Sequence, residues 1–210
     1  FEKLTEDYAQ VKKYLGVRLY PKEILANLGQ EITVGRDFGG DIYAMLVFDL
    51  PDTVQNVKPD QAAKWGKSFE ELFATGIQNI RQNYSFPLEQ MDLDGLKLWF
   101  VSGDHFFVPS IAFDLRHHPQ LLGTQGCLIG MPHRHAALIY PINGTEVIPA
   151  LNKMIVIVHG MEQEGPGSLS NNLFWYRDGH FENLPYKLEA GKLNFYPPNA
   201  FVDMLNVLAE

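Results

Sequence analysis

The sequence is poor in cysteine, in long apolar runs and in basic charge, and each shortage excludes a class of protein. Cys127 is the one cysteine in 210 residues, so no disulfide can form within the chain, which is typical of a reducing compartment. No apolar run approaches the roughly 18 residues of a membrane span. Lys and Arg number 17 against 25 Asp and Glu, a net charge of −8, whereas nucleic-acid binding rests on a basic face. We therefore expect an acidic cytoplasmic protein whose partner is neither a membrane nor a nucleic acid.

Several motifs that announce an enzyme locally are also missing. The chain has no GxxxxGK[S/T] phosphate loop, no GxGxxG fingerprint, no GxSxG nucleophile elbow and no HExxH metal motif. Enzymes whose sites assemble from distant segments are not excluded by these absences. The sequence therefore leaves catalysis open but leans against it, and it predicts no cofactor.

Composition and length favour one globular domain. Hydrophobic residues make up 46% of the chain and charged residues 20%, which is ordinary for a protein with a sizeable core. No internal repeat and no convincing linker interrupts the chain, so we predict a single α+β domain over residues 1–210. The chain begins at Phe1 rather than Met, and we expect it to derive from a longer precursor.

Apolar spacing and turn residues predict an α+β fold with a largely antiparallel sheet built from hairpins and helices packed on one face of it. The predicted helices are 2–15 (ending before Gly16), 21–28, 58–66 as a turn or short helix, the segment behind the Ser68–Glu71 capping box, 146–161, and a last helix with Asn199 as N-cap. The predicted strands pair as 31–34 with 41–50 through Gly39-Gly40, 86–92 with 96–102 around Asp94-Gly95, 126–131 with 134–140 around Pro132-His133, and 173–177 with 181–184 at Asp178-Gly179. Residues 106–115 fit either a strand or a helix.

Two histidines suggest a metal site. Residues i and i+2 of a strand point to the same face, so His133 and His135 can present two imidazoles to one zinc ion. Asp104 and His105, at the end of another predicted strand, are the candidates to complete the site, since catalytic zinc normally takes three protein ligands. The alternative is that Pro132-His133 is only the hairpin turn, with His135 on a solvated strand end.

Other reactive side chains have ordinary structural explanations. His117 and His118 are adjacent and precede Pro119, which favours a loop rather than a shared ion. Cys127 would be a nucleophile with a histidine beside it, but its apolar neighbours favour a buried thiol.

Two tryptophans are the expected ligand-binding residues. Exposed aromatic side chains often dominate interfaces, and Trp175 and Trp99 are the candidates for that role. The alternative is that one side of the run 174–176 is core and that Trp175 faces a helix or solvent. Gly165–Ser168 is the most evident flexible loop.

The segment 68–140 resembles the YtpQ-like bacterial proteins, a family of unknown function. The resemblance rests on the helix that begins at Phe69 and on the two apolar strands of 126–140, joined by a turn with Pro132. It implies a cytoplasmic bacterial protein of α+β type, and it implies no catalytic residue.

Three hypotheses for function follow. The first is a non-catalytic binding or interaction module with an unknown protein or small-molecule partner in a bacterial cytoplasm. The second is a metal-dependent hydrolase with His133 and His135 as zinc ligands. The third is a small-ligand or nucleotide sensor that holds its ligand between sheet and helices.

Overall fold

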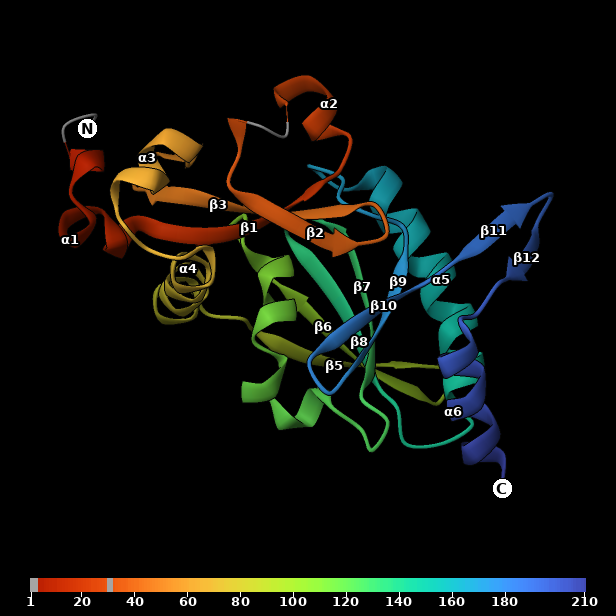
Figure 1. Cartoon of the computed structure of the whole chain (residues 1–210). Coiled ribbons are helices and arrows are strands. Elements are labelled where there is room, and N and C mark those ends of the chain that lie inside the picture. Colours follow the sequence, from red (N-terminus) through yellow and green to blue (C-terminus); the bar gives the residue numbers. More distant parts are fainter. Residues whose placement is uncertain (1–3, 30–31) are drawn as a thin grey trace. The chain divides into compact units, whose positions relative to one another are not determined.

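The computed structural model describes residues 4–29 and 32–210, and its chain divides into two compact units, 1–85 and 86–210. All strand pairs in both units are antiparallel, and helices pack on the sheets, so the predicted α+β class is confirmed (Figure 1). The prediction of one domain over 1–210 stays a prediction. Within the described residues, no helix is long and apolar enough to cross a bilayer.

The first unit begins with three short helical turns, not with one helix. They are η1 (Leu4–Glu6), α1 (Tyr8–Val11) and η2 (Lys12–Tyr14), after which β1 (Leu15–Pro21) starts. The predicted helix over 2–15 is therefore wrong, and its first two residues lie outside the described part. Asp7 caps α1 through Ala9 N–H, and Leu15 is already extended because it pairs with Phe48.

A four-stranded sheet forms the centre of the first unit. The strand β3 (Ile42–Leu50) is buried along most of its length and carries β1 on one side. On the other side it pairs with β2 (Gly35–Gly39) and with β4 (Thr53–Asn56). The predicted turn at Gly39-Gly40 is confirmed by positive φ angles of 127° and 53°, which favour glycine. The strand predicted over 31–34 lies instead at 35–39, and Glu31 is outside the described residues.

Three helices accompany this sheet. They are α2 (Ile24–Leu28), α3 (Pro59–Lys64) and α4 (Phe69–Asn83), and α4 packs against β1 (Figure 1). The predicted capping box is confirmed: Glu71 N–H donates to Ser68 Oγ at 3.2 Å, and Ser68 N–H donates to the Glu71 carboxylate at 2.9 Å.

The second unit is built on a six-stranded sheet in the order β10-β9-β7-β8-β6-β5. Its strands are β5 (Leu88–Leu93), β6 (Leu96–Ser102), β7 (Cys127–His133), β8 (Ala136–Pro141), β9 (Leu173–Arg177) and β10 (His180–Leu184). The hairpins predicted at Asp94-Gly95 and Asp178-Gly179 are confirmed, with positive φ at all four residues.

Helices cover one face of this sheet and 3₁₀ turns the other. α5 (Val147–Glu164) and α6 (Asn199–Ala209) share a core with the strands, while residues 106–115, left open by the sequence, form the 3₁₀ turn η4 (Val108–Phe113) (Figure 1). Two more turns, η5 (Leu115–His117) and η6 (Pro119–Leu121), follow η4, and a separate hairpin pairs β11 (Tyr186–Glu189) with β12 (Lys192–Phe195). Asn199 is not the N-cap of α6; Pro198 holds that position without a side-chain bond.

Candidate functional site

The turn between β7 and β8 carries the most distinctive group of side chains. β7 ends at His133 and β8 begins at Ala136, so Arg134 and His135 form the turn, and the predicted turn at Pro132-His133 is wrong. The pairing register slips between Gly130 and His133, which extends β7 through the buried Pro132 and places the turn beyond it.

The loop after α5 runs beside this turn. Arg134 N–H donates to Gly167 O at 3.1 Å, and Leu169 N–H donates to Pro132 O at 2.8 Å. A Cβ at Gly165 would lie 2.8 Å from His133 Nε2, and a Cβ at Gly167 would lie 2.7 Å from Arg134 Cδ. The loop that the sequence marked only as flexible therefore packs against both side chains, and its glycines leave room for them.

Arg134 is held by two further contacts. Its Nε donates to His135 Nε2 at 3.1 Å, and its guanidinium carbon lies 4.5 Å from the ring centroid of Phe106. Phe106 also makes an edge-on contact with His135, at 5.5 Å between ring centroids. Among the described residues, no carboxylate pairs with Arg134. Arg134, His133, His135 and Phe106 are called the Arg134 cluster below.

The hydrogen bonds of His135 fix its tautomer. Nδ1 lies 3.0 Å from Gly103 O, and because a carbonyl only accepts, Nδ1 carries the proton. Nε2 then has the lone pair, and it accepts from Arg134. Both nitrogens of the neutral ring are therefore engaged, which leaves no lone pair for a metal ion.

His133 lies in a region of positive charge. Its Nδ1 accepts from His135 N–H at 3.3 Å, so the proton of the neutral ring is on Nε2. The pKa of His133 is lowered from 6.5, first by burial and then by the neighbouring His135 and Arg134. A negative charge bound here would counter that repulsion.

The predicted zinc ligands are not assembled. His105 accepts at Nδ1 from Phe107 N–H at 3.2 Å and packs against Phe86, at 5.6 Å between ring centroids, while Asp104 is exposed. Over residues 4–29 and 32–210, no group of three or more His, Cys, Asp or Glu side chains could hold a metal ion. The i, i+2 spacing placed His133 and His135 near each other, at 6.5 Å between ring centroids, but their nitrogens serve the protein.

The two tryptophans are not exposed anchors. Trp175 is 5% exposed; its Nε1 donates to Gln125 O at 2.8 Å and its ring packs edge-on against Phe201. It is buried because it lies in the core that the sheet forms with α5 and α6. Trp99 is half-buried on β6, opposite Ile139 of β8. The exposed aromatic of the cluster is Phe106, which the sequence did not single out.

The remaining reactive candidates are structural. Cys127 is fully buried, and burial raises the pKa of its thiol far above the ordinary value, so it is no nucleophile. His117 Nδ1 and His118 Nε2 both contact the buried carboxylate of Asp114, at 2.9 and 3.1 Å. Asp114, which the sequence did not single out, therefore organises that histidine pair.

Comparison with protein-family models, with curated proteins and with solved structures finds no match for this chain.

Proposed function

We propose that the chain is a non-catalytic binding module whose ligand carries a negative charge and binds at the Arg134 cluster. One observation carries the proposal: Arg134 is oriented by His135, Phe106 and Gly167, yet no carboxylate of a described residue pairs with it, in a protein with a net charge of −8. In an acidic protein an arginine can readily pair with a carboxylate, and an arginine that has no such partner is available to a ligand.

The chemistry of the guanidinium names the ligand class. Arg presents donors in a rigid planar fork that matches a carboxylate or a phosphate. Only Nε is used by a described residue, so the Nη groups supply the fork. His133 Nε2–H is a second donor from the same turn. A protein or small molecule with such an anionic group is the partner that this arrangement supports.

Binding rather than catalysis is supported by the state of the reactive side chains in and beyond the Arg134 cluster. His135 has both ring nitrogens engaged and so cannot act as a general base without breaking a bond. The thiol of Cys127 is buried and protonated. A metal-dependent hydrolase is not proposed, because the predicted ligands do not converge.

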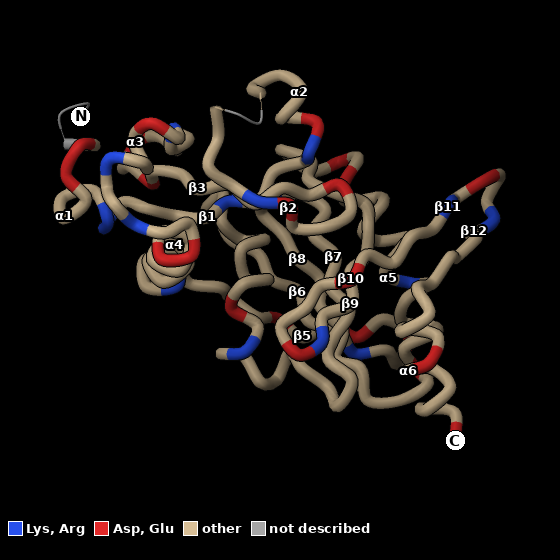
Figure 2. Tube along the Cα trace, viewed as in Figure 1, with Lys and Arg blue, Asp and Glu red and all other residues tan. Residues whose placement is uncertain are grey.

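The cellular setting is part of the proposal. A lone, buried cysteine supports a reducing compartment, and the resemblance of residues 68–140 to the YtpQ-like proteins supports a bacterial cytoplasm. Along the described chain, Figure 2 shows Lys and Arg positions scattered among Asp and Glu positions, which supports a partner other than nucleic acid.

The test measures anion binding by calorimetry and by thermal shift. Protein in a phosphate-free buffer is titrated with inorganic phosphate, sulfate and acetate at constant ionic strength. A ligand at ten times its Kd stabilises the native state by about 1.4 kcal/mol. Replacing Arg134 removes charged hydrogen bonds of about 1.5–3 kcal/mol each, so Arg134→Gln should weaken binding at least about tenfold.

Arg177→Gln is the matched control. Arg177 is more exposed than Arg134, but it also lies over an aromatic ring, that of Trp175, and it has an acidic partner in Asp178. This variant should bind as the wild type does. Equal binding by Arg134→Gln and wild type, or no saturable binding of any of the three anions, would refute the proposal.

A further inference from the structure

In the first unit, two segments of the chain lie along the same edge of β3: the segment that leads into β2 and the segment that contains β4. Phe48 faces Leu15 of β1 and Gln55 of β4, so β4 lies on the side of β3 away from β1, where β2 also pairs. The two segments meet at Leu46, whose N–H donates to Val34 O at 2.7 Å and whose carbonyl accepts from Val57 N–H at 3.1 Å. Beyond Leu46 the two segments diverge, and a gap opens between them.

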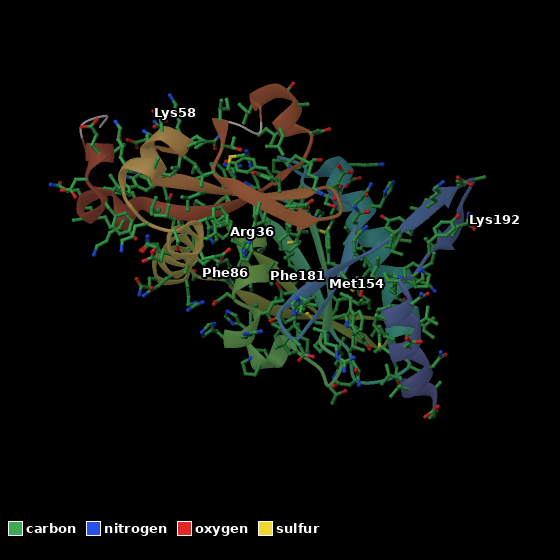
Figure 3. All side chains as sticks on the ribbon, in the orientation of Figure 1. Arg36, Lys58, Phe86, Met154, Phe181 and Lys192 are labelled. Atoms are coloured by element: carbon green, nitrogen blue, oxygen red, sulfur yellow. The ribbon has the colours of Figure 1, made fainter. Side chains whose placement is uncertain are left out.

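A cavity of about 710 Å³ occupies this gap. Its lining residues come from both segments: Leu28, Ile32, Thr33, Gln55, Asn56, Lys58, Pro59 and Asp60. Lys58, labelled in Figure 3, marks the α3 end of the cavity. Gln55 and Asn56 are neighbours on a strand, so their side chains point to opposite faces of the sheet. A cavity that both residues line must lie at an edge of β4. Because β3 occupies the inner edge, the cavity lies at the outer edge.

The outer edge of β4 has backbone groups that pair with no described residue. Along a strand, successive residues direct their N–H and C=O groups to alternate edges. Val57 N–H donates to Leu46 O, so Val57 bonds inward to β3, and Gln55, two residues earlier and opposite Phe48, does the same. The N–H and C=O groups of Val54 and Asn56 therefore point outward. No described residue hydrogen-bonds to them there.

The cavity walls match an aliphatic side chain. Leu28, Ile32 and Pro59 supply apolar surface, and the side chain of Ile32 is 50% exposed. Lys58 and Asp60 place one charge of each sign at the cavity, so its lining does not favour a charged side chain of either sign.

We propose that the outer edge of β4 binds an extended peptide segment of a partner protein. The segment adds a strand beside Val54 and Asn56 and places one aliphatic side chain between Leu28, Ile32 and Pro59. Strand addition of this kind takes affinity from main-chain hydrogen bonds and specificity from a side-chain pocket, and both lie at the same edge here. This site lies in the first unit and is independent of the Arg134 cluster.

The probes are acetylated and amidated seven-residue peptides of alternating Thr and Val, with the central residue set to Leu, Val, Phe, Glu or Lys. Binding to the ¹⁵N-labelled full chain is followed through the amide signals of Val54, Asn56 and Ile32. We expect these signals to shift with the Leu and Val peptides and to move much less with the Glu and Lys peptides.

A backbone variant separates strand addition from simple filling of the cavity. Asn56→Pro removes the outward N–H but no bond to β3, a position where an edge strand tolerates proline. It should lower affinity for the Leu peptide by about tenfold. Asn56→Ala keeps the N–H and is the matched control, with affinity close to that of the wild type. Both variants are first checked for a wild-type pattern of dispersed amide signals.

Peptides give a second test that does not depend on the folding of a variant. N-methyl groups are placed on alternate amides of the Leu peptide, in the two possible frames. One frame blocks the edge that faces β4 and should abolish binding, while the other should leave it. Equal binding in both frames, equal loss in Asn56→Pro and Asn56→Ala, or no shift of the Val54 and Asn56 amides with any peptide would each overturn the proposal.

Discussion

Gly167 lies against the aliphatic part of Arg134, so closely that a Cβ at position 167 would stand 2.7 Å from Arg134 Cδ. Gly167 also has a φ of +68°, in the left-handed region that other residues rarely adopt. The glycine therefore serves both the shape of the loop and the placing of the guanidinium.

Gly167→Ala should weaken anion binding at the Arg134 cluster. The added methyl displaces the arginine side chain from Phe106 and His135, and binding of phosphate should fall as far as in Arg134→Gln. The left-handed strain should also lower the free energy of unfolding by about 1–2 kcal/mol. Calorimetry with phosphate and urea denaturation measure the two effects.

Gly191→Ala is the matched control for that variant. Gly191 has a φ of +77° in the β11–β12 turn, but nothing lies within 4 Å of a Cβ there. It should show a similar loss of stability and unchanged phosphate binding. If both alanine variants kept wild-type binding, the packing of Gly167 against Arg134 would have no functional role.

A second prediction concerns the titration of His133. Its pKa in the folded state is below the ordinary 6.5, first because of burial and then because of the electrostatic effect of the neighbouring His135 and Arg134. Between the two pKa values the unfolded chain binds more protons than the folded chain, so His133 makes stability rise with pH in that window. Stability is lost as the pH falls below 6.5, and the effect is absent above it.

NMR titration of the His133 ring and urea denaturation from pH 5 to pH 7 test this prediction. Arg134→Gln should raise the pKa of His133, and saturating phosphate should raise it in the wild type but not in Arg134→Gln. His133→Gln should flatten the pH dependence of the free energy of unfolding in that range. If the pKa of His133 were the same in the wild type and in Arg134→Gln, the charge of Arg134 would not be one of the causes of the lowered pKa.

Local signals in the sequence were enough for much of the fold. The Asp94-Gly95 and Asp178-Gly179 turns and the Ser68–Glu71 capping box each fix a structure within a few residues, and all three predictions were confirmed. The strand β1 was missed because its first residue, Leu15, continued a helical spacing of apolar side chains. Residues 15–21 form a strand because they pair with β3, about thirty residues further along the chain. No pattern among the residues near Leu15 reveals that pairing.

The candidate site shows the same limit. The sequence brought His133 and His135 together, but the role of His135 depends on Gly103 O, and that of Arg134 depends on Phe106 and Gly167. These partners come from other loops, so no spacing rule near the histidines could reveal that the ring nitrogens were already used. Trp175 failed as a predicted anchor for a related reason, since its burial depends on Phe201 of α6, which lies far along the chain.

The last prediction concerns Asp114, whose side chain is only 6% exposed and contacts both His117 and His118. Asp114→Asn keeps the volume of the side chain but removes the charge that the two imidazoles share, so it should lower the free energy of unfolding by about 1–3 kcal/mol. Asp178→Asn is the control, because the side chain of Asp178 is 87% exposed and its ion pair with Arg177 should contribute no more than about 1 kcal/mol. Urea denaturation of both variants at pH 6 gives the two values. Equal effects would mean that the carboxylate of Asp114 contributes no more than a surface ion pair, whereas a loss confined to Asp114→Asn, with unchanged phosphate binding, would establish a structural role for Asp114 that is separate from the Arg134 cluster.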